Sequence, residues 1–389
     1  MERRQYQTIV LGLGALGSAT AWALARRTGG DVLGLEQSEL SHVHAGSHDH
    51  SRPISLAHDD INSITLVRAA YRAWARLETE RDLRLVHRVG ELNFFPEGSL
   101  ALFEAQRESL TQVGVSFEQM DGSAAMRRWT QFRLDDSVAV LHQPDGGLIS
   151  TSAALGTLQR SARHHGARLI EHAVIHDLRV RDGAYDVITS AGHFTTGCLI
   201  LAPGALTNAL LRSFGLFLPL RVIQQQGVYF AAEHLSQFMP GRFPIWRWRD
   251  NPTFAGVPVH GAPGVRVGQE GVGPEVTNGL RPFEPDLGVQ HRVSRFVQRL
   301  LPQLGPQLFC RPCLTTLTPD LSPIVDRVPG QANAWLAVDG AYGFEFAPAL
   351  GEALADLALG LTPEFDMTSY RVDRVAVREL QPARRTSTP

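Results

Sequence analysis

Short apolar runs and a stretch of small residues alternate at the start of the chain. Residues 8–11 (Thr-Ile-Val-Leu) and residues 32–35 (Val-Leu-Gly-Leu) are continuous apolar or near-apolar runs, which are typical of buried strands. Between them, residues 18–27 are mostly small and apolar and predict a helix. The N-terminal segment therefore predicts a strand, a helix and a second strand in the order of a βαβ unit.

Further along the chain, the pattern changes between helical and strand-like periodicity. Leu66, Ala70, Trp74 and Leu77 share one face of a helix predicted over residues 63–82. The other predicted helices cover residues 151–166, 289–301 and 348–359, the last with Pro348 in its first turn, where proline is favoured. The other predicted strands include residues 89–95, 167–175, 185–189, 199–202, 227–230, 264–267 and 335–338.

These elements predict two interleaved units. The βαβ patterns occupy residues 1–82, 146–216 and 322–389, whereas segments of antiparallel character occupy residues 83–145 and 217–321. A chain of 389 residues is also long for a single core. We predict an α/β fold in which a Rossmann-type dinucleotide-binding domain is interleaved with an antiparallel-sheet substrate domain.

Composition narrows the class of protein. The 37 basic and 39 acidic residues give a net charge of −2, which disfavours a nucleic-acid-binding protein. Every basic residue is an arginine, so no lysine can form a Schiff base or donate from an ammonium group. No apolar stretch reaches the ~18 residues of a membrane span, and the first residues do not resemble a signal peptide. We expect a cytoplasmic protein that interacts with neither membranes nor nucleic acids.

The turn after the first strand carries a dinucleotide-binding motif. Gly12 permits a tight turn, Gly14 lets the backbone approach a pyrophosphate, and Gly17 allows the helix to pack closely. The N–H groups of the first helical turn would face the phosphates. Glu36 ends the second strand, where a carboxylate can bind the hydroxyls of an adenosine ribose. The motif disfavours NADP but does not by itself distinguish FAD from NAD.

Two other groups of residues suggest metal or disulfide chemistry at first sight. Residues 41–52 are rich in histidine, but they lie in a predicted loop without the matched spacing of a metal site. Cys198, Cys310 and Cys313 are too few for a disulfide framework and lack a second metal-ligand pair. We predict neither a metal site nor a disulfide.

The order of these landmarks resembles the amine-oxidising flavoproteins typified by monomeric sarcosine oxidase and N-methyltryptophan oxidase, which have the DAO-type fold. The resemblance extends over nearly the whole chain. It rests on six segments: residues 12–17 with Glu36, 46–52, 144–147, 204–205, 313–320 and 343–348.

This resemblance implies FAD as the cofactor and oxidation of a carbon–nitrogen bond by hydride transfer to the flavin. The resulting imine is hydrolysed by water. In the family a cysteine that matches Cys313 attaches the flavin covalently, and Arg52 matches an arginine close to the flavin. Arg311 could lower the pKa of the Cys313 thiol by its charge. The expected cofactor-binding residues are Gly12, Gly14, Gly17, Glu36, Ser51, Arg52, Ile175, Cys313, Gly343 and Phe344.

The chain departs from the family at positions that bind the substrate carboxylate. An arginine of the family is replaced by Ser55, and a lysine by Glu345. The family's active-site histidine corresponds to Glu270, and its oxygen-activating lysine corresponds to Arg266. A pocket tyrosine corresponds to Phe254. Two cations are lost and two carboxylates gained, so we expect an amine other than sarcosine, with Arg52, Arg266, Glu270 and Glu345 as catalytic candidates.

Several alternatives stay open from the sequence. A flavoenzyme of the same fold could oxidise a C–OH bond or desaturate a biosynthetic intermediate, and a protein of another class could bind flavin without catalysis. Arg266 keeps a positive charge but cannot release a proton at usable pH, so the electron acceptor is either oxygen or another molecule. We expect a small-molecule amine substrate and a monomer.

Overall fold

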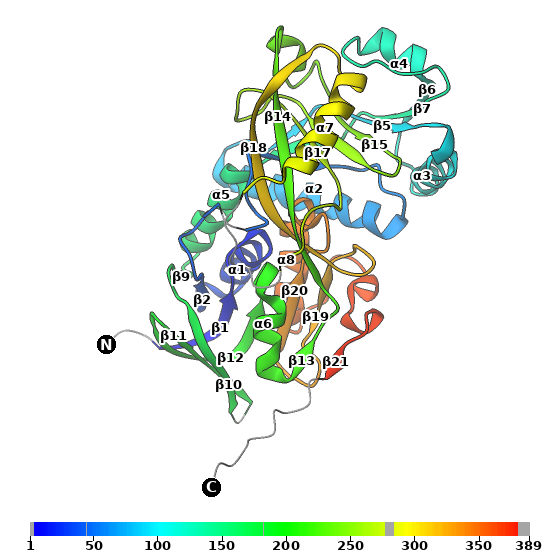
Figure 1. The fold of residues 1–389 in the computed structure, drawn as a ribbon. Helices are drawn as coiled ribbons and strands as arrows, with labels where there is room; N and C mark the ends of the chain where they lie inside the picture. The colour runs from blue at the N-terminus through cyan, green and yellow to red at the C-terminus, as the bar shows by residue number, and fades with distance from the viewer. Residues whose placement is uncertain (1–3, 44, 182, 277–283, 380–389) are drawn as a thin grey trace.

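The computed structural model describes residues 4–43, 45–181, 183–276 and 284–379. Two large sheets dominate it, one in the lower half of Figure 1 and the other in the upper half. Two long neighbouring strands, β14 (Arg221–Ala232) and β18 (Leu304–Leu317), run from the upper half toward the lower half. The fold is the mixed α/β arrangement predicted from the sequence.

The lower sheet is built around parallel strands. β1 (Gln5–Leu11) lies between β12 (Gly192–Leu201) and β2 (Val32–Leu35), and β12 also pairs in parallel with β20 (Ala334–Val338). The remaining strands are β9 (Arg168–Ile170), β10 (Ile175–Arg181), β11 (Ala184–Thr189) and β19 (Ile324–Arg327). Because parallel strands expose their carboxyl ends at one edge, β1, β2 and β20 deliver the turns that follow them to a common region.

Helices cover one face of this sheet. They are α1 (Ala15–Thr28), α5 (Thr151–His164) and α8 (Gly343–Ala358), and α1 packs against both α5 and α8; α2 (Ile61–Arg81) packs on α8. The indole rings of Trp22 and Trp74 are fully buried in the core between these helices and the sheet. A separate apolar core fills the opposite face.

The upper sheet is antiparallel except for one pair. Its order is β18-β14-β17-β16-β15-β5-β7-β6, and β15 and β5 are parallel neighbours. These strands are β5 (Glu91–Phe95), β6 (Glu118–Asp121), β7 (Ala139–Gln143), β15 (Ile245–Trp248), β16 (Phe254–Val257) and β17 (Val265–Gln269). Three helices lie in this half of the molecule: α3 (Leu100–Gln112), α4 (Gly122–Arg128) and α7 (Leu287–Leu300).

Smaller elements complete the architecture. The strands β3 (Ser51–Ile54), β4 (Val86–Arg88) and β8 (Gly147–Ser150) form a three-stranded sheet. The strands β13 (Leu216–Phe217) and β21 (Arg378–Glu379) pair with each other, and α6 is Thr207–Leu211. Within the described residues, no helix is long and apolar enough to cross a membrane.

The predicted domain boundaries stay a prediction. The lower sheet takes its strands from residues 5–35, 168–201 and 324–338, and the upper sheet takes them from residues 91–143 and 221–317. The three-stranded sheet draws on segments assigned to both predicted units, because β4 belongs to one and β3 and β8 to the other.

One predicted helix boundary is wrong. The helix expected to begin at Pro348 begins at Gly343, so Pro348 lies inside α8. The first turn has no side-chain cap, and proline in a helix interior removes a backbone hydrogen bond, so the sequence signals favoured a later start. The earlier start matters because it places Gly343, Phe344 and Glu345 on the first turn of a helix.

Candidate active site

Two neighbouring cavities lie between the two large sheets. We call the one beside the glycine turn the nucleotide cavity and the other one the polar cavity. They share Gly46, Leu314, Asp339, Gly343 and Phe344 as lining residues. The cavities therefore meet at a junction formed by the start of α8, the turn before it, β18 and the loop before β3.

The glycine turn of the nucleotide cavity leaves no room for side chains. Gly12 has a φ of 90°, and a Cβ there would lie 2.5 Å from the carbonyl oxygen of Ala202. A Cβ on Gly14 would lie 3.1 Å from the Ser47 hydroxyl. Gly12 and Gly14 line the cavity, whereas Gly17 does not: its Cβ would lie 1.9 Å from the Gly12 carbonyl oxygen. Gly17 thus lets α1 pack on the turn.

Glu36 holds the end of β2 against this turn. Its Oε2 accepts a hydrogen bond from the Leu13 N–H at 2.9 Å, and its Oε1 accepts one from the Ser38 N–H at 3.1 Å. The side chain is buried and lines the nucleotide cavity together with Ile175. A bare glycine turn, a helix N-terminus and a fixed carboxylate fit the pyrophosphate and ribose of a dinucleotide such as FAD.

All four predicted catalytic residues, Arg52, Arg266, Glu270 and Glu345, line the polar cavity. Three residues that the sequence analysis did not single out also line it: Glu91, Arg247 and Tyr342.

Arg266 does not offer a free positive charge. Its Nε lies 2.7 Å from Oδ2 of Asp49, which is 2% exposed and also accepts a hydrogen bond from the Tyr229 hydroxyl. Burial alone would raise the pKa of Asp49, but Arg266 and then Arg52 outweigh it and lower the pKa to about 2. The charge that we expected at the position of the oxygen-activating lysine is therefore compensated by a buried carboxylate.

Arg52 organises the histidine-rich loop. One terminal nitrogen of its guanidinium donates to the carbonyl oxygens of Gly46 at 3.0 Å and His48 at 2.9 Å. Its Nε is buried and has no hydrogen-bond partner within the described ranges. Among the same residues, no group of three or more His, Cys, Asp and Glu side chains could hold a metal ion.

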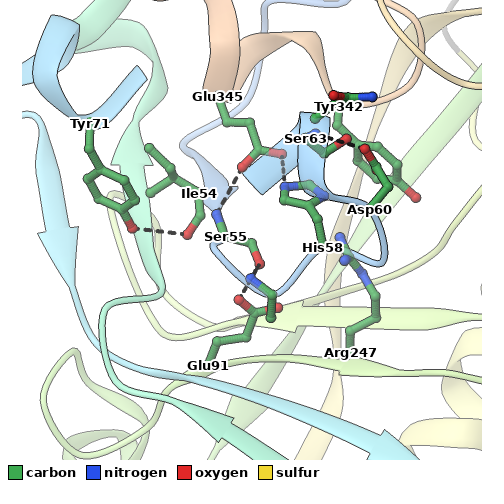
Figure 2. Close-up of polar contacts among 12 residues, drawn as sticks. Ile54, Ser55, His58, Asp60, Ser63, Tyr71, Glu91, Arg247, Tyr342 and Glu345 are labelled. Atoms are coloured by element: carbon green, nitrogen blue, oxygen red, sulfur yellow. Dashed lines mark hydrogen bonds and ion pairs between the residues drawn. The ribbon is translucent and has the colours of Figure 1, made fainter. Parts of the chain in front are cut away.

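Glu345 is held by neighbours on two sides (Figure 2). Its Oε2 accepts the backbone N–H of Ser55 at 2.9 Å, and its Oε1 lies 3.5 Å from Nε2 of His58. Burial alone would lower the pKa of His58, but the Glu345 carboxylate outweighs this effect and raises it above 6.5. Glu345 is only 4% exposed, so it is not a solvated surface acid.

Glu91 adds a second buried carboxyl to this group. Its Oε2 accepts a short hydrogen bond from the Ser55 hydroxyl, and its Oε1 accepts one from the Asn93 amide at 3.0 Å. Burial raises the pKa of Glu91, although the nearby Arg247 guanidinium opposes the shift. This carboxyl can therefore hold a proton at a higher pH than an exposed glutamate.

Arg247 is a further buried cation of the polar cavity. Its Nε lies 3.2 Å from Glu270, and its guanidinium lies 5.2 Å from the ring centre of Tyr342. The Tyr342 hydroxyl donates to Glu270 at 3.3 Å. Burial alone would lower the pKa of Arg247, but Glu270 outweighs it and raises the pKa. Glu270 and Glu345 thus each have a positive or protonatable neighbour, which makes the cavity less acidic than the sequence suggested.

Three predicted cofactor-binding residues, Gly17, Ser51 and Cys313, line neither cavity. Cys313 is 2% exposed and lies on β18 opposite Gln225. Its chain neighbour Leu314 lines both cavities, so Cys313 is adjacent to the junction along the chain.

Sequence signals for the missed residues were weak. Arg247 lies in Ile-Trp-Arg-Trp on β15, an alternating pattern that normally places arginine in solvent. His58 follows β3 in a segment without a motif. Only the fold brings Arg247 to the polar cavity and His58 to within 3.5 Å of Glu345.

Comparison with known proteins places the fold among flavoenzymes. The family model for FAD dependent oxidoreductase matches residues 7–357. N-methyl-L-tryptophan oxidase of Salmonella heidelberg (strain SL476) is 27% identical over 377 residues, covering 95% of this chain and 99% of that protein.

Solved structures agree on the fold. The open form of NikD, described as an unusual amino acid oxidase essential for nikkomycin biosynthesis, superposes with a TM-score of 0.84 at 24% identity, covering 95% of this chain and 98% of that chain. Glycine oxidase from Geobacillus kaustophilus superposes with a TM-score of 0.81 at 17% identity, covering 96% of this chain and 100% of that chain.

Proposed function

The chain belongs to the FAD-dependent oxidoreductase family, and on this premise we propose that it oxidises the carbon–nitrogen bond of a primary or secondary amine. The single observation that carries the proposal is the direct junction between the nucleotide cavity and the polar cavity. A dinucleotide bound at the glycine turn can extend through this junction, so that its reactive end meets a substrate among the polar side chains. The N-methyl-L-tryptophan oxidase relative supports an amine as the substrate class.

The side chains of the polar cavity suit an amine. Bound FAD would accept a hydride from the carbon next to nitrogen. Glu345, Glu270 and Glu91 present carboxyl oxygens that can bind the N–H groups of the substrate and orient its carbon. A carboxyl with a raised pKa, such as that of Glu91, can also take the proton that an ammonium must lose before oxidation.

The same side chains argue against sarcosine. Ser55 and Glu345 stand where the family has two cations for the substrate carboxylate, and here they bond to each other. Arg247 supplies one cation, but its Nε already faces Glu270. We propose an amine whose polar end offers both hydrogen-bond donors and acceptors, rather than a simple N-methyl amino acid.

Product analysis tests this function. The purified protein is incubated with an artificial electron acceptor and either N-methylated amines or hydroxy compounds. The carbonyl product and any released amine are then quantified. This assay does not depend on oxygen as the acceptor. Carbonyl and amine in equal amounts support carbon–nitrogen oxidation, whereas acceptor reduction only by hydroxy compounds would replace it with C–OH oxidation.

We also propose that the flavin is attached through Cys313. Cys313 adjoins Leu314 in the chain, and Leu314 lines the junction. Arg266 lies near Cys313: burial lowers the pKa of Arg266, Asp49 and Tyr229 raise it, and Cys313 raises it by a smaller amount. Acid precipitation tests the bond: yellow colour should stay with the pellet of the natural protein and move to the supernatant for Cys313→Ala. Colour in the supernatant of the natural protein would remove Cys313 from the site.

Three further expectations stay predictions from the sequence. They are oxygen or another molecule as electron acceptor, a monomeric state and a cytoplasmic location.

A further inference from the structure

Asp339 lies in the passage between the two cavities. It follows β20 directly and lines both the nucleotide cavity and the polar cavity. Two glycines approach it closely: a Cβ on Gly343 would clash with the Asp339 Cβ at 2.0 Å, and a Cβ on Gly46 would lie 4.0 Å from Oδ2. Any ligand that occupies both cavities must therefore pass this carboxyl group.

The carboxyl group is incompletely hydrogen-bonded. Its Oδ1 is inaccessible to solvent and has no hydrogen-bond partner among the residues that the structure describes. Burial raises the pKa of Asp339 to about 7, so the neutral acid is well populated near neutral pH. Buried polar atoms without a partner are rare in folded proteins, and each one calls for a ligand, a water or a functional reason.

Arg52 offers the complementary unsatisfied group. Its Nε–H is also buried without a partner in the described ranges, although its terminal nitrogen is hydrogen-bonded to the loop. Burial has the largest effect on the pKa of Asp339 and raises it, whereas the positive charge of Arg52 lowers it. The two side chains are therefore close enough to interact electrostatically. Both line the polar cavity, yet neither satisfies the other's free atom.

A hydroxyl group can satisfy a donor and an acceptor at once. FAD carries such groups on the sugar-alcohol chain that connects its flavin ring to its pyrophosphate. If the pyrophosphate lies at the glycine turn and the ring reaches the polar cavity, this chain crosses the junction. We propose that Asp339 is a cofactor-binding residue whose carboxyl group, together with the Arg52 guanidinium, binds a hydroxyl of that sugar-alcohol chain.

The proposal rests on FAD binding and not on the nature of the substrate. A purely structural acid would have its oxygens satisfied by the protein, as Arg26 and Arg76 satisfy both carboxyl oxygens of Glu352. Asp339 instead has an oxygen without a partner among the described residues, and it lines both cavities.

The test compares FAD with ADP, which contains the adenosine and pyrophosphate but lacks the sugar-alcohol chain. Full-length protein carrying Cys313→Ala, so that flavin can be exchanged, is stripped of flavin and titrated with each ligand. Asp339→Ala should weaken FAD binding about tenfold, the value of one good hydrogen bond, and leave ADP binding unchanged. Asp339→Asn, which can still donate and accept, should recover most of the affinity.

A positioning control and a stability measurement complete the test. Glu36→Ala should weaken FAD and ADP together, because Glu36 faces only the nucleotide cavity. The flavin-free Asp339→Ala protein should be at least as stable to heat as its parent, because an unsatisfied buried carboxyl has been removed.

Two results would overturn the proposal: equal FAD affinity in Asp339→Ala and its parent, or equal loss of FAD and ADP affinity. Should Asp339→Ala not fold, a flavin dinucleotide with a deoxygenated chain serves as the probe on the parent protein. It should bind about tenfold more weakly than FAD, and equal binding would contradict the assignment.

Discussion

The backbone N–H of Ser55 donates a hydrogen bond to Oε2 of Glu345 at 2.9 Å, joining the two positions at which the resemblance implies carboxylate-binding cations. The contact links the segment after β3 to the first turn of α8. In the part of the chain that the structure describes, a backbone donor and the His58 imidazole, rather than an arginine, contact the buried Glu345 carboxylate. The two departures that we inferred from the resemblance therefore meet in one contact.

Reversing the charge at position 345 should change substrate preference. Glu345→Lys places an ammonium across Ser55 from the Glu91 carboxyl and supplies a cation for a substrate carboxylate. We expect kcat/KM for N-methyl amino acids to rise at least about tenfold, or ~1.4 kcal/mol, because the repulsion of the carboxylate is removed. Glu345→Gln, which removes the charge without reversing it, should give a smaller gain. A folded Glu345→Lys protein without any gain would argue against this role.

The His58–Glu345 pair should make stability depend on pH. The pKa of His58 is raised above 6.5, so the pair contributes its full stability below that pH and loses it as pH rises through the raised value. Burial opposes the shift, Glu345 causes it, Arg247 weakens it and Glu91 supports it. Melting temperatures across this range should fall more steeply for the natural protein than for Glu345→Gln.

Glu91 also changes its protonation with pH. Because it is present in both the natural protein and Glu345→Gln, its effect on the melting temperature cancels when the two pH profiles are compared. An NMR titration of the His58 ring gives an independent value. Parallel pH profiles for the two proteins, or a His58 pKa at or below 6.5, would be inconsistent with the pair.

The buried pair of Asp49 and Arg266 should be strongly coupled. Asp49→Asn leaves the Arg266 guanidinium buried without its counter-ion, which should lower the free energy of unfolding by about 3–5 kcal/mol. Replacing both residues by apolar ones, as in Asp49→Leu with Arg266→Met, should recover much of this loss. Urea unfolding measures both effects, and additive losses in the double variant would refute the coupling.

The Asp49–Arg266 ion pair should also make the stability of the protein depend on pH in acid. Because the pKa of Asp49 is lowered to about 2, its contribution to stability persists above its ordinary value of 3.8 and is lost as pH falls toward 2.

Two glycines of the turn should respond differently to alanine. A Cβ on Gly17 would lie 1.9 Å from a backbone carbonyl oxygen that cannot move freely, so Gly17→Ala should destabilise the fold itself. A Cβ on Gly14 would lie 3.1 Å from the Ser47 hydroxyl, which can rotate away. Gly14→Ala should therefore fold but bind FAD more weakly, because the methyl group enters the nucleotide cavity. Thermal unfolding and FAD titration separate the two effects, and equal FAD affinity in Gly14→Ala would count against the site.

The N-terminal unit could be predicted from the sequence because its signals are local. The predicted strands at residues 8–11 and 32–35 lie within β1 and β2, and the helix predicted between them is α1. The glycine spacing and Glu36 are set within a single βαβ unit, so no distant contact had to be known.

The electrostatics of the polar cavity could not be predicted in the same way. The sequence showed Arg266 as a cation but not that Asp49, 217 residues earlier in the chain, neutralises it. It showed Glu270 and Glu345 as added acids but not that Arg247 and His58 accompany them. These pairs depend on how the two large sheets are placed relative to each other. Strand or helix periodicity in the sequence contains no information about that placement.

The central claim is tested most directly by adding matched compounds to the flavin-bound protein without oxygen and following the visible flavin absorbance. Each pair contains a secondary amine and the alcohol in which a hydroxyl replaces the amino group. The account predicts that amines bleach the flavin, most strongly those without a simple carboxylate, and that their alcohol partners do not. Bleaching by the alcohols with no response to any amine would contradict carbon–nitrogen oxidation at this site.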